Sequence, residues 1–194
     1  MELGYRAELC PRVSLDVAAF YNESEKLFSL SPLSPIPMTG AIPYLLIPVR
    51  NGNESNGRAY GTELTTSWQA TDWWRLRLTY SFMNMKYTAP PGVRTDNAAY
   101  IPQQFSLNSG WNLGKHFQVD AWLRCVDEVR DGGIPSYVTA DLRLAWKPGP
   151  AWEFSIVGQN LLDPRHPEYG RAFIEHGPLT EVQRSVYGKV TWKF

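Results

Sequence analysis

The chain has 194 residues, enough for one domain with a sizeable core, and its 19 basic residues are balanced by 19 acidic ones. This balance argues against nucleic acid as a partner, because nucleic-acid binding requires an excess or a cluster of basic side chains. The two cysteines, Cys10 and Cys125, lack metal-site spacing and are interpreted as small apolar residues, with a disulfide as the alternative.

Nine segments alternate apolar and polar side chains with the two-residue period of a β-strand, which predicts an all-β antiparallel meander. In chain order they cover residues 2–9, 13–19, 63–68, 74–82, 104–111, 117–124, 138–146, 152–159 and 185–194. No stretch reaches the ~18 apolar residues of a transmembrane helix. Met1 is followed by Glu2 rather than by a signal peptide, so we expect the chain either to be cytosolic or to lack its true start.

The connections between the predicted strands are alternately short and long. The short ones, CPR, TDW, LGKH and KPGPA, contain the Pro, Gly and Asp residues of tight turns. The long ones cover residues 23–58, 84–101, 125–136 and 162–183. In an antiparallel meander every second connection lies at the same end, so the tight turns should share one end of the sheet and the long loops the other.

The polar side of the predicted sheet carries more charge than a dry core can hold, because an unpaired buried charge is costly. Its charged residues include Arg75, Arg77, Asp120, Arg124, Asp141, Arg143 and Glu153. With strands of ~10 residues and asymmetric loops, this pattern favours a membrane barrel in which these side chains face a polar lumen and the apolar side faces lipid. A soluble β-sandwich with a solvated outer face is the alternative.

Tryptophans gather at the strand ends next to the predicted tight turns. They are Trp68, Trp73, Trp74, Trp111, Trp146, Trp152 and Trp192. In a membrane barrel this arrangement predicts an aromatic girdle at the periplasmic interface. The last ten residues, SVYGKVTWKF, keep the alternation to the end, so Trp192 and Phe194 are expected to face lipid at the periplasmic edge.

Five segments carry motifs that are fairly specific in combination. They are SLDVAAFYNESEKL (14–27), AYGTELTTSWQATDWWRLRLTYS (59–81), IPQQFSLNSGWNL (101–113), VGQNLLDPRHPEY (157–169) and RSVYGKVTWKF (184–194). Within them stand a Gly-x-Glu-Leu strand, an Asn-Leu-Leu-Asp segment followed by His166, and a terminal Arg-x-x-Tyr-Gly strand. The combination resembles the C-terminal part of TonB-dependent outer-membrane receptors, and the resemblance covers essentially the whole chain.

The resemblance implies that residues 1–194 are about nine strands at the C-terminal end of a 22-stranded outer-membrane β-barrel, without the plug domain and the earlier strands. It implies a location in the outer membrane of a Gram-negative bacterium and uptake of an iron–siderophore complex or a similar large nutrient. The implied partners are outer-membrane lipid, the barrel assembly machinery acting on the C-terminal strand, and TonB acting only through the missing plug. An odd strand count, unlike the even count of bacterial barrels, agrees with a C-terminal fragment from a truncated gene or a mis-assigned start.

The sequence predicts neither an enzyme nor a resident cofactor. It contains no Gly-x-Ser-x-Gly motif, no phosphate loop and no plausible catalytic triad. Asp163, His166, Glu168, Glu175 and His176 are possible metal-binding side chains, but their spacing fits no common motif, and we predict no metal site. The stretch DEVRDGG at 127–133 lacks the ligand register of a calcium loop and is predicted to be a solvated turn.

Ligand contact is expected in the external loops, because binding residues concentrate on loops held by a rigid scaffold. The longest loop, residues 23–58, carries Phe28, Tyr44 and Arg50, which we predict to contact the ligand. Two other functional interpretations remain open. One is a truncated or vestigial structural β-domain without transport, and the other is a small independent outer-membrane barrel.

Overall fold

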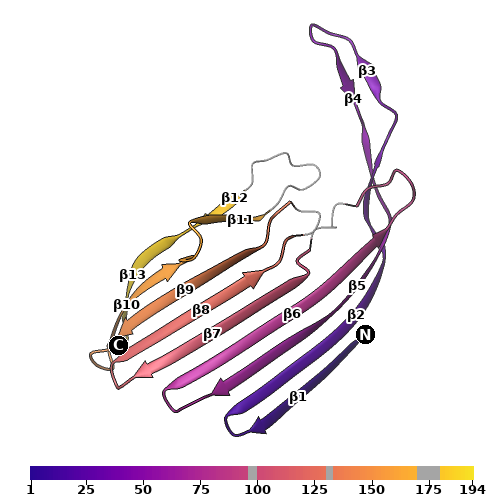
Figure 1. Ribbon diagram of the computed structural model, residues 1–194. Helices are drawn as coiled ribbons and strands as arrows, with labels where there is room; N and C mark the ends of the chain where they lie inside the picture. The colour runs from indigo at the N-terminus through magenta and orange to yellow at the C-terminus, as the bar shows by residue number, and fades with distance from the viewer. Residues whose placement is uncertain (96–99, 130–132, 170–179) are drawn as a thin grey trace.

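The computed structural model describes residues 1–95, 100–129, 133–169 and 180–194, which form antiparallel β-structure without a helix (Figure 1). Nine strands make one sheet. Across it they are β1 (Glu2–Cys10), β2 (Val13–Pro32), β5 (Val49–Gln69), β6 (Trp74–Thr88), β7 (Gln103–Leu113), β8 (Phe117–Val126), β9 (Tyr137–Trp146), β10 (Trp152–Gln159) and β13 (Ser185–Trp192). The predicted nine-stranded antiparallel meander is confirmed.

Two small hairpins stand apart from the main sheet. One consists of β3 (Ile36–Met38) and β4 (Tyr44–Leu46), and the other of β11 (Arg165–Tyr169) and β12 (Thr180–Gln183). Both arise within connections that were predicted to be loops. Over the ranges described, the chain has no helix with the length and hydropathy of a membrane span.

The connections separate by length as predicted. The tight turns that join β1 to β2, β5 to β6, β7 to β8 and β9 to β10 lie together at one end of the sheet, and the long connections lie at the other (Figure 1). We call these the short-turn end and the loop end. Because nine is an odd number of crossings, the chain enters the sheet at the loop end and leaves it at the short-turn end.

The expectation of a loop throughout residues 23–58 is wrong. β2 and β5 stay paired beyond the sheet as far as the Pro32–Val49 partners, and only the segment that carries β3 and β4 remains between them. The ladder shifts register twice between Ser24 and Ser29, and Lys26 has a φ of 57°. These bulges break the two-residue period, so the alternation that marks a strand is lost although the pairing continues.

Three smaller expectations also differ from the structure. The predicted loop at 84–101 is a strand as far as Thr88, and the predicted loop at 162–183 contains β11 and β12. The last strand ends at Trp192 rather than at Phe194, although the amide of Lys193 still donates to the carbonyl of Ala151 at 2.8 Å. Cys10 and Cys125 are free thiols, so the alternative of a disulfide between them is not observed.

The pairing register gives the sheet one apolar and one polar face, because directly opposite residues point to the same side. A row of successive partners on the apolar face runs Tyr5, Val17, Leu64, Tyr80, Phe105, Cys125 and Val138. The adjacent row on the polar face runs Arg6, Asp16, Thr65, Thr79, Ser106, Arg124 and Thr139. Consecutive residues of one strand therefore alternate between apolar and polar, whereas direct partners on neighbouring strands are of the same kind in these rows.

The sheet is a single layer over the described residues, with no second sheet packed on either face. Large apolar side chains on the apolar face are accordingly exposed: Leu3 is 77% exposed, Ile156 61% and Val190 60%. A soluble sandwich would bury such a face against a second sheet. The sandwich alternative is thus not observed.

Candidate functional site

The polar face carries a continuous row of ion pairs near the short-turn end, which we call the ion-pair row. Arg75 on β6 approaches Asp120 on β8 at 3.7 Å, and Asp120 also accepts from Arg143 on β9 at 2.8 Å. Arg143 pairs in turn with Glu153 on β10, whose other carboxylate oxygen lies 3.4 Å from Lys147 Nζ. Charges of alternating sign thus link β6 to β10, and pairing of this kind offsets the cost of removing them from water.

A glycine makes the first of these pairs possible. Gly110 on β7 lies between its partners Arg75 and Asp120 in the ladder. A Cβ at this position would come within 2.9 Å of Arg75 Nε and 3.1 Å of Asp120 Oδ1. The ion pair passes directly over the backbone of β7, so a larger residue at Gly110 would push the two side chains apart.

A second polar cluster surrounds Asn160, at the loop end where the chain leaves β10. The Asn160 side chain accepts hydrogen bonds from Thr139 at 3.1 Å and Arg124 at 3.4 Å, and it donates to the carbonyl of Gln183. The backbone amide of Asn160 donates to the Asp141 carboxylate, which also forms an ion pair with Arg124 at 3.0 Å. Asn160 is buried with a φ of 53°, a conformation that Asn tolerates better than most residues.

The Asn160 cluster connects three segments that are distant in the sequence. Because it joins β8 and β9 to Gln183, the last residue of β12, it fixes where the chain leaves the sheet and where it returns to it. The sequence interpretation gave Arg124 and Asp141 a place on the polar face, and the structure puts them together with Asn160. Thr139 and Gln183 were not predicted, since neither is charged and only the folded register brings them to the site.

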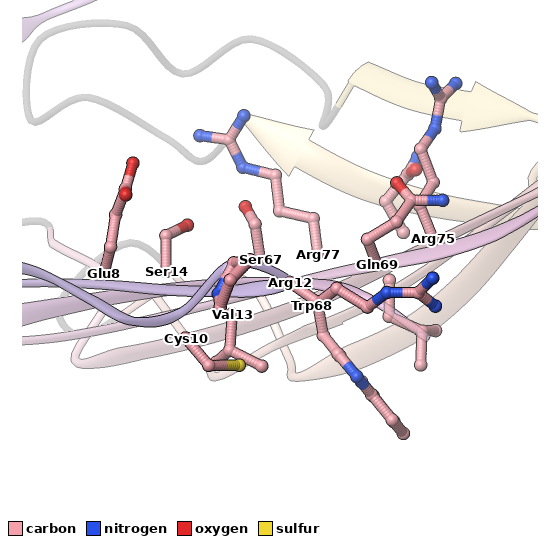
Figure 2. Close-up of a pocket in the computed structure, with 13 residues that line it drawn as sticks. Glu8, Cys10, Arg12, Val13, Ser14, Ser67, Trp68, Gln69, Arg75 and Arg77 are labelled. Atoms are coloured by element: carbon pink, nitrogen blue, oxygen red, sulfur yellow. The ribbon is translucent and has the colours of Figure 1, made fainter. Parts of the chain in front are cut away.

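The short-turn end of the polar face also contains an open groove of about 530 Å³ (Figure 2). Its lining includes Glu8, Gln69, Arg75 and Arg77, and Figure 2 shows Arg77 and Glu8 projecting to the same side of the strands while Trp68 projects to the other. Arg77 is exposed and has no ion pair or hydrogen bond with the described residues. It therefore provides an available positive charge on this face.

Of the seven charged residues predicted on the polar side, six take part in ion pairs with one another: Arg75, Asp120, Arg124, Asp141, Arg143 and Glu153. Lys147, which pairs with Glu153, extends the ion-pair row beyond them. Lys147 was missed because it follows the last alternating residue of β9. Its place as the first residue of the turn KPGPA, which leads into the strand that carries Glu153, was the signal available.

The predicted aromatic residues gather on the apolar face at the short-turn end. Ring centroids are 6.1 Å apart for Trp68 and Trp74, 5.6 Å for Trp146 and Phe154, 5.7 Å for Trp152 and Trp192, and 5.6 Å for Trp192 and Phe194. Trp111 is the direct partner of Trp74 in the ladder. The contacts thus form two clusters of rings at this end, one on β5 and β6 and the other on β9, β10 and the C-terminal residues.

At the loop end the apolar face stops at a polar boundary. Tyr21 and Tyr60 are partners on β2 and β5, and the next residues on this face, Glu23 and Arg58, form an ion pair of 3.1 Å. From Trp68 to Tyr60 the strand rises ~27 Å, or ~21 Å for a strand tilted by about 40°. This is close to the ~25 Å apolar band of outer-membrane barrels.

The three residues predicted to contact a ligand lie on the projecting part of the chain but do not converge. Phe28 is on β2 and Tyr44 is on β4, and both are exposed. Arg50, on β5, pairs with Glu54 at 3.5 Å. Residues 27–49 contain no charged side chain, so the tip that carries Tyr44 is an uncharged apolar hairpin.

His166 is buried on β11 and is held by three neighbours. Its ring stacks on Tyr137 with centroids 4.0 Å apart, Nε2 lies 3.1 Å from Glu168, and Nδ1 lies 3.6 Å from Asp163. The two carboxylates contact opposite ring nitrogens, which is not how three ligands surround one metal ion. In the described ranges no group of three such side chains could hold a metal, and Glu175 and His176 lie outside those ranges.

Residues 1–161 match the family model described as TonB dependent receptor-like, beta-barrel. In solved structures, all of this chain aligns with 31% of the copper transporter OprC at a TM-score of 0.73 and 15% sequence identity. It aligns with 28% of the siderophore receptor PiuA from Acinetobacter baumannii (TM-score 0.72, 19% identity) and 31% of the FrpB iron transporter, F5-1 variant, from Neisseria meningitidis (TM-score 0.71, 15% identity). The chain thus spans less than a third of each, and no curated protein matches its sequence.

Proposed function

The chain belongs to the β-barrel family of TonB-dependent receptors, and on that premise we propose that it forms part of the wall of an outer-membrane receptor for an iron–siderophore complex or a similarly large nutrient. The family consists of outer-membrane receptors of Gram-negative bacteria, and the neighbours named above are transporters and receptors rather than enzymes. The observation that carries the proposal is the two-faced sheet, apolar on one side and lined with paired charges on the other.

In this proposal the polar face looks into the barrel lumen. Arg75, Asp120, Arg143 and Glu153 would then lie in a wet interior, where a row of paired charges is tolerated. The same side chains facing hydrocarbon would cost several kcal/mol each. The opposite face supports this orientation, because its exposed apolar side chains are more stable in contact with lipid than with water.

The ends of the sheet have different roles in the proposal. The short-turn end, with its two clusters of aromatic rings, is placed at the periplasmic interface, where aromatic rings lie at the level of the headgroups. The loop end is placed outside the cell. β13, whose apolar row includes Val190 and Trp192, is the strand we assign to the barrel assembly machinery. Contact with TonB is assigned to a plug domain rather than to this sheet.

The edges of the sheet favour residence in a larger barrel. β1 and β13 each have one unpaired side in the described structure, and lipid does not satisfy backbone groups. Because the sheet has nine strands, β1 and β13 run in the same direction, and closing it with antiparallel seams takes an odd number of further strands. We therefore propose that other strands complete the barrel, as the one-third coverage of the neighbours suggests.

The proposed function is tested in a strain that lacks the gene, grown under iron limitation on a panel of 55Fe-labelled ferric siderophores. We expect loss of uptake of at least one complex, restored by the gene on a plasmid. In the same strains the protein should remain with outer membranes after carbonate extraction. Recovery of the protein in the soluble fraction without detergent would contradict the proposal, as would unchanged uptake of every complex tested.

A further inference from the structure

On the apolar face, from β8 to β13, side-chain size decreases between two neighbouring rows of cross-strand partners. The row nearer the short turns is bulky and runs Leu113, Phe117, Trp146, Phe154 and Val190. The next row begins at Trp111 on β7, continues with the smaller Val119, Leu144 and Ile156, and ends at Gly188, which has no side chain. Together the two rows line an open apolar trough of about 590 Å³ that crosses five strands.

Gly188 keeps one end of this trough open. A Cβ built at this position would meet no atom within 4 Å, so the space above it is unfilled. The opposite wall is held in place by aromatic contacts, since Phe154 lies 5.6 Å from Trp146 and 6.1 Å from Trp152 between ring centroids. A trough with one fixed wall and an empty floor suits a slender, flexible apolar chain.

A cation lies at the other end of the trough. Lys115 is in the tight turn between the lining residues Leu113 and Phe117, is exposed, and has no hydrogen bond or ion pair with the described residues. The turn itself is fixed, because the amide of Lys147 donates to the carbonyl of His116 at 2.7 Å. Lys147, by contrast, is occupied by Gln118 and Glu153.

We infer that the trough binds one acyl chain of an anionic phospholipid whose phosphate pairs with Lys115. The inference rests on the proposed function, which places this face in lipid and the short turns at the level of the headgroups. Lipid tails are as apolar as the trough, so burial alone gives no preference over the surrounding bilayer. Selection comes from van der Waals fit against the fixed wall and from the lysine, a charge that attracts anionic headgroups.

The test uses the protein purified in detergent from outer membranes and mixed with phosphatidylglycerol or phosphatidylethanolamine, with bound lipids counted by native mass spectrometry. We expect wild type to retain one phosphatidylglycerol molecule in preference. Gly188→Leu, which fills the trough, should lose it, and Gly188→Ala should show intermediate retention. Lys115→Gln should lower the preference for phosphatidylglycerol about fivefold, the change expected for ~1 kcal/mol per lysine near an anionic surface.

Ala19→Leu is the matched control, since it adds side-chain bulk to the apolar face of β2, away from the trough. Equal retention of phosphatidylglycerol by wild type and Gly188→Leu would overturn the site, as would an unchanged headgroup preference in Lys115→Gln. Heat-modifiable gel mobility shows that each variant is folded, and Gly188→Ala carries the test if the leucine variant is not. A wild-type protein that fails to enter the membrane overturns the proposed function, whereas normal insertion without dependence on Gly188 overturns only the lipid site.

Discussion

Replacing residues 33–48 by a two-residue Asn-Gly turn is expected to abolish ligand uptake while leaving membrane insertion intact. The deletion removes β3 and β4 but keeps the last partners of the long ladder, Pro32 and Val49, which a short turn can join. The removed tip is uncharged and exposes Tyr44, Leu45 and Ile42 at 59%, 58% and 81%. Because it projects beyond the sheet, it contributes contact surface rather than stability (Figure 1).

The measurement is the initial rate of 55Fe uptake from a complex that the wild-type protein transports, together with the amount of folded protein in the outer membrane. A second variant, with Tyr44 and Leu45 both changed to Ser, keeps the length of the hairpin and removes only its apolar surface. We expect it to weaken ligand binding more than maximal uptake. Unchanged uptake by the deletion variant would reject the assignment of ligand contact to this hairpin.

A charge placed on the apolar face at the middle of the sheet is expected to block assembly, whereas the same charge one residue away is expected to be tolerated. Leu78 on β6 is the partner of Leu107 on the apolar face, and Thr79 is the partner of Ser106 on the polar face. Leu78→Arg should destabilise the protein by ~2–4 kcal/mol, the cost of arginine at the midplane of a barrel. Thr79→Arg should cost little, because it enters an open polar groove lined by Glu63 and by Arg124, whose charge is already paired with Asp141.

The two variants are compared by the amount of heat-modifiable protein in outer membranes and by the midpoint of guanidinium unfolding in detergent or lipid. The substitutions are adjacent and at the same depth, so they differ in the face that they occupy and little else. Equal loss in both variants would mean that the two faces do not have different surroundings.

The main sheet could be predicted from the sequence because most of its strands alternate apolar and polar residues. Between Trp74 and Phe82, for example, each even-numbered residue is bulky and apolar or aromatic and each odd-numbered one is polar. Trp111, Leu107 and Phe105 continue the apolar row on β7, whereas Ser109 and Gln103 interrupt it. Tight turns such as LGKH then fix where each hairpin reverses. Alternation, turn chemistry and loop length all agree in this part of the chain, so the strand order followed from them.

The part of the β2–β5 hairpin beyond Ser24 could not be predicted from the sequence, because its bulges remove the two-residue alternation on which strand prediction depends. Near Lys26 the period is lost, and the prolines after it suggest a loop. What keeps the hairpin paired is long-range. The amide of Glu54 donates to Ser29 Oγ at 3.0 Å, and both Ser29 and Leu30 are buried. Contacts between residues so far apart in sequence leave no local pattern.

The sequence predicted which charged residues lie on the polar face, but it did not predict which of them form ion pairs with one another. A period of two places Arg75, Asp120 and Arg143 on one face, which the sequence shows. That Arg75 reaches Asp120 across an intervening strand depends on Gly110 being the residue between them, and this requires the register of three strands. Asn160 likewise acts through residues on β9 and ahead of β13 that only the fold brings together.

The central claim, that the apolar face meets lipid and the polar face a lumen, is tested most directly by nitroxide scanning of β6. Single cysteines at positions 75–81, in a protein with Cys10 and Cys125 changed to Ser, carry a spin label in liposomes. Collisions with oxygen, which concentrates in lipid, should be frequent at positions 76, 78 and 80 and rare at 75, 77, 79 and 81. A reversed alternation, or uniform accessibility along the strand, would contradict the account.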